Sequence, residues 1–384
     1  MKQQIYWDNA ATTFPKPLAV REAMQNALSW YGANPGRGGH AMASRTSEEL
    51  YRCRKTAADF FGCTSPERVV FTLNCTTAIN MVVKGVLQNG GHALISDLEH
   101  NAVVRPLHAL SPLSYKIVQT HPRNPAQTVE NFRRAITRDT RLIVCTHASN
   151  VWGYIQPIRE LGVLAAQYGI PFLVDAAQSA GILPIDMEKD HIDFLCVAGH
   201  KGLYGPMGTG MLITSARFSL PSYTQGGTGS RSMSPSQPED WPDHMESGTP
   251  NTAGICGLRA GMDWVKRMGV SRIHHYEIAC VQKVYRCLET ERRVQLYTTY
   301  PTVDMYAPVL TFNYEGIPSE TAAAWLDEAG LAVRAGLHCA PLAHRKAGTE
   351  SHGAVRLAPS FFTSAEEVEK VCKILLQTAQ KSLQ

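Results

Sequence analysis

The chain has 384 residues, a net charge of +4 and a pI of about 8.5, and its length predicts one large and one smaller domain. Its basic residues are scattered except for a short run over residues 133–141, which is more typical of a solvated helix end than of a nucleic-acid-binding surface. The most apolar stretch, residues 161–184, contains Gln167, Asp175 and Gln178, so we expect no membrane span and a soluble, cytoplasmic protein.

Short apolar runs alternate with longer amphipathic segments through much of the chain. Runs typical of strands cover residues 68–72, 93–96, 142–146, 172–174, 194–197 and 210–213. Segments with helical periodicity cover residues 77–87, 103–109, 129–136 and 158–168. This alternation predicts an α/β fold with a mostly parallel sheet and helices on both faces. Such a sheet binds ligands at the C-terminal ends of its strands.

Residues 226–250 interrupt this pattern, because they are rich in Gly, Ser and Pro and have no periodicity. We interpret them as a long functional loop. Two helices, over residues 254–268 and 273–292, then lead into a unit with the order strand, helix, strand and a last helix from about Ser364.

These patterns divide the chain into two units. We predict a large domain over residues 15–255. Residues 256–384 form a smaller α/β C-terminal domain, to which residues 1–14 also belong.

The ten cysteines include no Cys-x-x-Cys pair and no regular set of short spacings. This distribution is typical of reduced thiols rather than of a disulfide framework. Most of these cysteines lie in apolar patterns, where a buried, unreactive thiol is the default interpretation. Cys339 does not lie in such a pattern.

Two residues that follow successive apolar runs have complementary chemistry. Asp175 ends the run Phe-Leu-Val-Asp, and Lys201 follows the next run in Ala-Gly-His-Lys-Gly-Leu-Tyr-Gly-Pro. A lysine amine can hold an aldehyde as an imine, and an aspartate at the end of a buried strand can keep a pyridine nitrogen protonated. The pair therefore indicates pyridoxal 5'-phosphate as cofactor and an amino acid as substrate.

Other polar residues follow the ends of the predicted strands. Thr76 and Thr77 begin a helix, where N–H groups and hydroxyls can bind phosphate, although threonines that only cap a helix are the plainer alternative. His100 can stack on the pyridine ring and move protons, although a lone histidine is more often structural. Asn150 can bind the cofactor or substrate, and Gln178 can reach the phenolic oxygen of the ring. Their order along successive strands makes the combined pattern strong.

Eight motifs occur in the order found in class V aminotransferase-fold enzymes. They are Asp8-Asn9-Ala10-Ala11-Thr12-Thr13, Thr76-Thr77, Glu99-His100-Asn101, Ser149-Asn150, Asp175-Ala176-Ala177-Gln178-Ser179, Gly199-His200-Lys201, Glu246-Ser247-Gly248-Thr249-Pro250-Asn251 and Arg334-Ala335-Gly336-Leu337-His338-Cys339-Ala340. Within this set the chain resembles a group II cysteine desulfurase, similar to selenocysteine lyases, and the last motif is the most specific. The resemblance spans nearly the whole chain. It implies fold type I of the pyridoxal-phosphate-dependent transferases, as in aspartate aminotransferase.

The resemblance implies roles for individual residues around the cofactor. Lys201 resembles the Schiff-base lysine, and His100 resembles the stacked imidazole. Asp175 and Gln178 resemble the ligands of the ring nitrogen and the ring oxygen. The implied phosphate ligands are Thr77 and His200, joined by Thr249 and the Gly226-Gly227 turn of a second subunit. A homodimer is therefore implied.

The resemblance also implies the reaction, in which L-cysteine becomes L-alanine and Cys339 accepts the sulfur as a persulfide. Arg356 resembles the arginine that binds the substrate carboxylate with its planar fork of donors. A sulfur-acceptor protein is then the expected partner. The thiolate is the reactive form of Cys339, and we expect nearby basic residues to lower the pKa of the thiol: His338, Arg334, His344 and Arg345.

Two positions depart from the family pattern. Ala198 stands where relatives usually have a serine, so one phosphate hydroxyl is missing and Thr76, Thr77 or a water must compensate. Gly202 lengthens the loop after Lys201.

Three alternatives stay open. The chain could be a selenocysteine lyase that acts on L-selenocysteine, another C–S lyase, or an aminotransferase of the same class. It could also be a non-catalytic pyridoxal-binding or carrier-docking protein, although a carboxylate-binding Arg356 beside Lys201 argues against this. Cys339 could be a structural thiol, or a metal ligand together with His338, His344 and His352. We expect no metal site. The adjacent residues His338 and Cys339 are poorly placed to bind one metal ion, and the chain has no set of four ligands at the spacing of a closed site.

Overall fold

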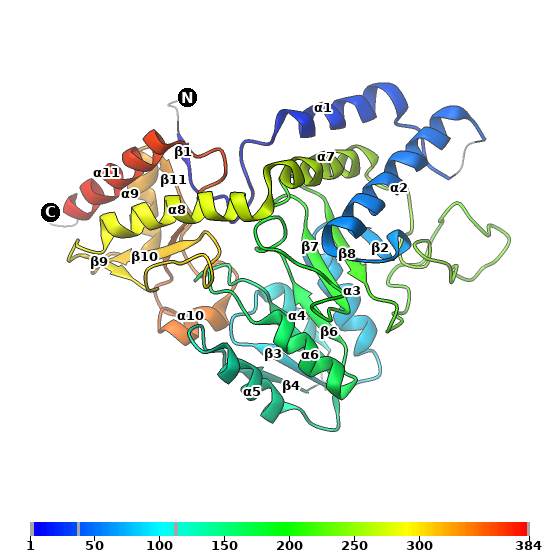
Figure 1. The fold of residues 1–384 in the computed structure, drawn as a ribbon, viewed down its shortest axis with the longest axis horizontal. Coiled ribbons are helices and arrows are strands. Elements are labelled where there is room, and N and C mark those ends of the chain that lie inside the picture. Colours follow the sequence, from blue (N-terminus) through cyan, green and yellow to red (C-terminus); the bar gives the residue numbers. More distant parts are fainter. Residues whose placement is uncertain (1–3, 37–38, 111–113, 382–384) are drawn as a thin grey trace.

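The computed structural model describes residues 4–36, 39–110 and 114–381. Its larger unit is built on a seven-stranded sheet with the strand order β2-β8-β7-β6-β5-β3-β4 (Figure 1). The strands are β2 (Val69–Thr72), β3 (His92–Ser96), β4 (Ser114–Val118), β5 (Thr140–Thr146), β6 (Phe172–Asp175), β7 (Phe194–Ala198) and β8 (Gly210–Thr214). Strand β8 runs antiparallel to both of its neighbours, and the other neighbouring strands are parallel. The predicted mostly parallel sheet is confirmed.

Successive residues of a buried strand face two different cores. In β5, Ile143 and Cys145 belong to one hydrophobic cluster, whereas Leu142 and Val144 belong to another. This alternation follows from the two-residue period of a strand, and it requires apolar cover on both faces. The first face is covered by α2 (Ala41–Phe61), α5 (Pro125–Ala135), α6 (Ile158–Tyr168) and α7 (Thr252–Met268), and the second by α3 (Cys75–Val86) and α4 (Asn101–Ala109).

Strand β4 was not predicted from the sequence. It pairs only with β3 among the described strands, and three of its five residues are exposed. An edge strand of this kind needs no continuous apolar run, so its pattern is weak. The predicted long loop over residues 226–250 is confirmed, because this segment contains no helix or strand.

The smaller unit lies at one end of the molecule, where strand β1 and helix α11 also lie (Figure 1). Its three-stranded antiparallel sheet, β12-β10-β9, shares a core with three helices and with Trp7. These elements are β9 (Val294–Leu296), β10 (Leu310–Tyr314), β12 (Val355–Leu357), α8 (Val270–Leu288), α9 (Ser319–Glu328) and α11 (Ala365–Lys381). The predicted domain limits stay predictions, and their outer ends, residues 1–3 and 382–384, lie outside the described residues.

The N-terminal segment connects the two units. Strand β1 (Ile5–Tyr6) pairs with β11 (Leu331–Ala332) of the smaller unit. A few residues later, the Thr13 N–H donates to the carbonyl oxygen of His200 at 3.1 Å, in the loop that follows β7. The segment therefore spans from the small sheet to the loop that carries Lys201. Helix α1 (Leu18–Asn26) follows it and packs against α7.

Within the described ranges, no helix combines the length and the apolar composition that crossing a bilayer requires.

Candidate active site

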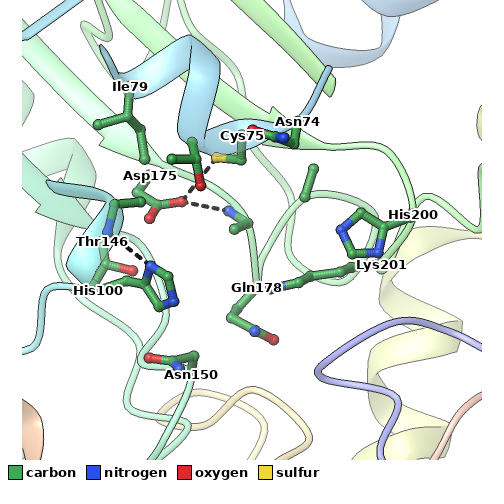
Figure 2. A pocket seen from close by; sticks show the side chains of 14 residues that line it. Asn74, Cys75, Ile79, His100, Thr146, Asn150, Asp175, Gln178, His200 and Lys201 are labelled. Carbon is green, nitrogen blue, oxygen red and sulfur yellow. Dashed lines mark hydrogen bonds between the residues drawn. The ribbon is translucent and has the colours of Figure 1, made fainter. Parts of the chain in front are cut away.

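A cavity of about 100 Å³ lies where β3, β5, β6 and β7 end and α3 begins (Figure 2). Because the carboxyl ends of parallel strands meet at one edge of a sheet, the segments that follow them converge here. The cavity brings together seven of the residues predicted from the sequence: Thr76, His100, Asn150, Asp175, Gln178, His200 and Lys201.

Lys201 lies in a loop that is held in place through its carbonyl groups. Lys16 Nζ donates to the carbonyl oxygen of His200 at 2.7 Å, and Thr13 Oγ1 donates to that of Lys201 at 3.1 Å. Lys201 is partly buried, and desolvation of its amine, followed by the charge of Arg356, lowers its pKa, whereas Asp175 acts to raise it. A lowered pKa increases the neutral fraction of the amine, which is the nucleophilic form.

Asp175 ends β6 and is nearly buried. Its Oδ1 accepts hydrogen bonds from the Ala177 N–H at 2.9 Å and from Cys75 Sγ at 3.4 Å (Figure 2). Among the described residues, no group donates to the second oxygen, Oδ2. One carboxylate oxygen is thus fixed by the protein and the other is available to a ligand.

Cys75 was not predicted as a site residue. It is the first residue of α3, lines the cavity and bonds Asp175. Its position directly before Thr76 was the available signal, but the sequence does not show that its side chain turns toward a strand 100 residues later.

His100 is the N-cap residue of α4. Its Nδ1 accepts a hydrogen bond from the Ala102 N–H at 3.0 Å. Burial is the main cause that lowers the pKa of His100, so the ring is neutral near pH 7. A neutral ring that accepts at Nδ1 carries its proton on Nε2. His100 therefore presents a donor at its second nitrogen.

His200 has an unpaired polar atom beside Lys201. Its Nδ1 is buried and has no hydrogen-bond partner. Burial, followed by the charges of Lys201 and Lys16, lowers the pKa of His200 to about 4. Thr76 lies on the same cavity at the N-terminus of α3, whose free N–H groups favour an anion.

Thr77 and Thr249 do not line this cavity. The Thr77 N–H and Oγ1 both donate to Asn74 Oδ1, so this threonine takes part in the cap of α3. Thr77 and Thr249 line a separate hollow of about 490 Å³ that is more open to solvent. Ala198 does line the cavity, and as the sequence predicted it supplies no hydroxyl there.

Arg356 lies on β12 and is almost completely buried. Its Nη2 forms an ion pair with Asp8 Oδ1 at 2.9 Å, and its Nη1 donates to the carbonyl oxygen of Asn150 at 3.0 Å. Its buried Nε has no partner. Asp8 was not predicted as a site residue, because nothing in the motif that contains it indicates a partner near the other end of the chain.

Cys339 is exposed on a strained turn. His338 and Cys339 have φ values of +49° and +56°, a backbone region that side chains other than glycine rarely adopt. The carbonyl oxygen of Cys339 accepts from the Asn101 N–H at 2.7 Å, and that of His338 accepts from Asn150 Nδ2 at 2.9 Å. The turn is thus attached to the two segments that carry His100 and Asn150.

The two histidines near Cys339, His338 and His344, are uncharged in the folded protein. Burial lowers the pKa of His338 to about 2 and that of His344 to about 4, and both rings are therefore neutral near pH 7. The rings stack on each other with 5.6 Å between their centroids. No group of three His, Cys, Asp or Glu side chains that could hold a metal occurs in the part of the chain that the structure describes.

Comparison with known proteins places this geometry in a family. Residues 5–371 match the family model described as aminotransferase class V. The chain belongs to the class V aminotransferase family. The predicted α/β fold type I and the predicted membership of this family are confirmed, and enzymes of this family in general depend on pyridoxal phosphate.

The relatives described below are all named as cysteine desulfurases. A probable cysteine desulfurase from Methanothermobacter thermautotrophicus is 32% identical over 388 residues, which cover 99% of this chain and 96% of that protein. A cysteine desulfurase from Escherichia coli is 32% identical over 351 residues, 87% of this chain and 84% of that protein. The solved cysteine desulfurase from Thermococcus onnurineus NA1 has a TM-score of 0.89 and 31% identity, and the match covers 98% of this chain and 95% of that one. The predicted resemblance to cysteine desulfurases is confirmed.

Proposed function

We propose that this protein is a pyridoxal-phosphate-dependent cysteine desulfurase that converts L-cysteine to L-alanine and transfers the sulfur to Cys339. The observation that carries the proposal is the attachment of the Cys339 turn to the rim of the Lys201 and Asp175 cavity. Asn101, whose N–H binds the Cys339 carbonyl, follows His100 directly in the chain, and His100 lines that cavity. The names of the relatives support the same reaction.

The residues of the cavity fit pyridoxal phosphate. Lys201 would hold its aldehyde carbon, and Asp175 Oδ2 would accept from its ring nitrogen. The unpaired Nδ1 of His200 and the N-terminus of α3 at Thr76 would bind its phosphate. When bound, this group withdraws electrons from the Cα of the amino acid. In a homodimer, Thr249 and the Gly226-Gly227 turn of a second subunit would add phosphate ligands.

Side chains of the protein supply substrate binding and proton transfer. Arg356 would bind the substrate carboxylate, and its unpaired Nε and its bond to Asn150, which lines the cavity, support this role. Lys201 Nζ is the base for the Cα proton, because His100 carries a proton on Nε2 and its Nδ1 is already bonded. His100 would orient the ring and donate a hydrogen bond.

Cys339 would act as a thiolate nucleophile toward the substrate sulfur. The new bond joins the two sulfur atoms, the substrate carbon–sulfur bond breaks, and the carbon fragment leaves as alanine after protonation. The persulfide on Cys339 then passes its outer sulfur to an acceptor protein or, in a test tube, to an added thiol that releases it as sulfide.

The test is turnover of L-cysteine in the presence of a reductant by the wild-type protein and by Cys339→Ala. We expect alanine and sulfide from the wild type, and at least about a 100-fold loss of both rates in the variant. The absorbance of the bound cofactor should be retained. Another C–S lyase or an aminotransferase would keep its turnover in this variant.

Cys372→Ala is the matched control, because Cys372 is a half-buried thiol of α11. This control should turn over cysteine at the wild-type rate. Sulfide release by Cys339→Ala at an unchanged rate would show that the assignment of Cys339 is wrong.

A further inference from the structure

We infer that Lys346 is a positioning residue that fixes the Cys339 turn by clamping the following helix onto the large unit. The helix is α10 (Pro341–Ala347), which begins directly after the turn. The inference rests on the proposed function, because it concerns the residue that we propose as sulfur acceptor.

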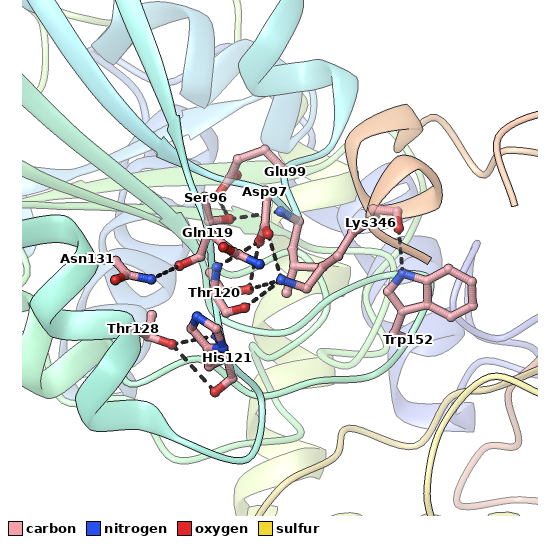
Figure 3. Close-up of polar contacts among 12 residues, drawn as sticks. Ser96, Asp97, Glu99, Gln119, Thr120, His121, Thr128, Asn131, Trp152 and Lys346 are labelled. Atoms are coloured by element: carbon pink, nitrogen blue, oxygen red, sulfur yellow. Dashed lines mark hydrogen bonds and ion pairs between the residues drawn. The ribbon is translucent and has the colours of Figure 1, made fainter. Parts of the chain in front are cut away.

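Lys346 reaches from α10 to the ends of two strands of the large sheet (Figure 3). Its Nζ lies 2.6 Å from Asp97 Oδ2 and 2.5 Å from the carbonyl oxygen of Thr120. Asp97 directly follows β3, and Thr120 lies just after β4. The other carboxylate oxygen, Asp97 Oδ1, accepts from Thr120 Oγ1 at 2.7 Å and from its N–H at 3.2 Å. One ammonium group therefore joins α10 to two neighbouring strand ends.

This ion pair is partly removed from water, unlike the other ion pair of α10. The Lys346 and Asp97 side chains are only 20% and 13% exposed, whereas those of Arg345 and Glu350 are 62% and 47% exposed. Exposed pairs contribute little, because water screens them and the side chains lose mobility. The bonds from Thr120 also fix the Asp97 carboxylate in advance, so Lys346 meets a preformed acceptor.

A second contact attaches the same helix to the large unit. Trp152 Nε1 donates to the carbonyl oxygen of Ala343 at 2.9 Å (Figure 3), and the indole packs in a small cluster with Ala340 and Ala343. Helix α10 has only seven residues, and a helix of this length is not stable without tertiary contacts. Trp152 and Lys346 therefore both hold it in position, together with Leu342, which packs in a core of the large unit.

The turn before the helix depends on that position. His338 and Cys339 both adopt the left-handed region, which costs free energy and persists only when the surroundings hold it. The carbonyl oxygens of both residues are bonded to the large unit. If α10 shifts, these two bonds and the direction of the thiol shift with it.

Lys346 acts at a distance from the chemistry. Neither Lys346 nor its partners Asp97 and Thr120 line the cavity that contains Lys201. A change at Lys346 should thus leave substrate and cofactor binding intact and alter only the placement of the sulfur acceptor.

The test compares Lys346→Met with the wild type in cofactor-loaded protein. We expect kcat for sulfide and alanine release to fall about tenfold, because displacement of a reacting group by a fraction of an ångström weakens a well-aligned attack. The KM for cysteine and the cofactor absorbance should stay unchanged. In the absence of substrate, iodoacetamide should alkylate Cys339 several-fold faster, as followed by mass spectrometry of the peptide.

Lys283→Met is the matched control, because it removes a lysine from an exposed ion pair with Glu369 on the smaller unit, and it should behave as the wild type in all four measurements. Lys346→Arg, which keeps the charge, should restore most of kcat. Asp97→Asn should reproduce the effect of Lys346→Met, and it replaces that variant if Lys346→Met fails to fold.

The inference is overturned if Lys346→Met and Asp97→Asn match Lys283→Met in both kcat and alkylation rate. Failure of the proposed function gives a different pattern, in which the wild type makes no alanine or Cys339→Ala keeps full turnover. The alkylation rates would still decide in that case whether the clamp holds the turn.

Discussion

At the scale of single residues, Glu277 shows how the fold accommodates an acid away from water. It lies on α8 and is fully buried, and its Oε1 accepts from the Tyr204 hydroxyl at 3.1 Å. The same hydroxyl accepts from the Phe361 N–H at 2.9 Å. Burial raises the pKa of Glu277 from 4.5 to about 8. The carboxyl is therefore held in its neutral form at neutral pH.

This raised pKa predicts a pH-dependent stability. Between about pH 4.5 and pH 8 the folded protein keeps the Glu277 proton and the unfolded chain loses it. The folded state then binds more protons, so the free energy of unfolding falls as the pH rises through this window. In Glu277→Gln this contribution is absent, and the variant should gain about 1 kcal/mol or more relative to the wild type between pH 5 and pH 8.

Urea unfolding at several pH values measures this difference. Glu289→Gln, an exposed position after the C-terminal end of α8, serves as the control and should follow the wild-type profile. Parallel profiles for Glu277→Gln and the wild type would contradict a buried, neutral Glu277.

At the scale of elements, the sequence predicted the strands and helices that carry buried apolar runs. Strands β5, β6 and β7 lie within a residue or two of their predicted limits, because each is buried on both faces. Strand β4 was missed because one face is exposed, and α2 was missed because its apolar residues are mixed with charged ones. Local pattern predicts an element only where burial is continuous.

The loop after β7 requires glycine at position 202, and the reason lies in packing that the sequence does not show. Gly202 packs against the turn at Gly181. A Cβ on Gly202 would lie 2.5 Å from the carbonyl oxygen of Ala180 and 2.8 Å from Ile182 Cγ1. These contacts are too short for a methyl group, so the loop with Lys201 needs glycine at this position.

We therefore predict that Gly202→Ala destabilises the protein by about 1–3 kcal/mol, since the backbone carbonyl must move to admit the methyl group. Thermal unfolding measures the loss. Gly39→Ala is the matched control, because a Cβ there meets no atom within 4 Å. Equal melting temperatures for the two variants would exclude a packing role for Gly202.

The sequence predicted those residues of the candidate site that lie at the ends of strands. Asp175 ends β6 and Lys201 follows β7, and parallel topology alone brings them to one edge. The bond from Cys75 to Asp175 and the ion pair of Asp8 with Arg356 were not predictable, because each joins side chains that only the folded chain brings together. The neutral state of His338 likewise follows from burial, which the motif does not show.

At the scale of the whole molecule, helix α1 and the segment that follows it expose large apolar side chains. Leu18, Leu28 and Trp30 are 59%, 76% and 75% exposed and lie on α1 and on the short helical segment that continues it, Ala27–Tyr31. Large apolar side chains that are exposed in a folded chain are often covered at a protein interface. We expect a second copy of the chain to cover them in the predicted homodimer.

Trp30→Lys should then raise the dissociation constant of the dimer at least about tenfold, because buried tryptophans dominate interface energies. Sedimentation equilibrium over a range of protein concentrations measures this constant. Tyr168→Lys, which changes an aromatic residue that is 49% exposed at the end of α6, should leave it unaltered. A dimer unaffected by Trp30→Lys would place the interface elsewhere.

The N-terminal segment that runs from the small sheet to the His200 carbonyl has a mechanical consequence. The Cys339 turn and Lys346 bridge the same two halves from the other end of the chain. A clamshell movement of the halves would have to break both bridges in every catalytic cycle. We therefore expect the two units to keep their relative placement during turnover rather than to open and close about a hinge.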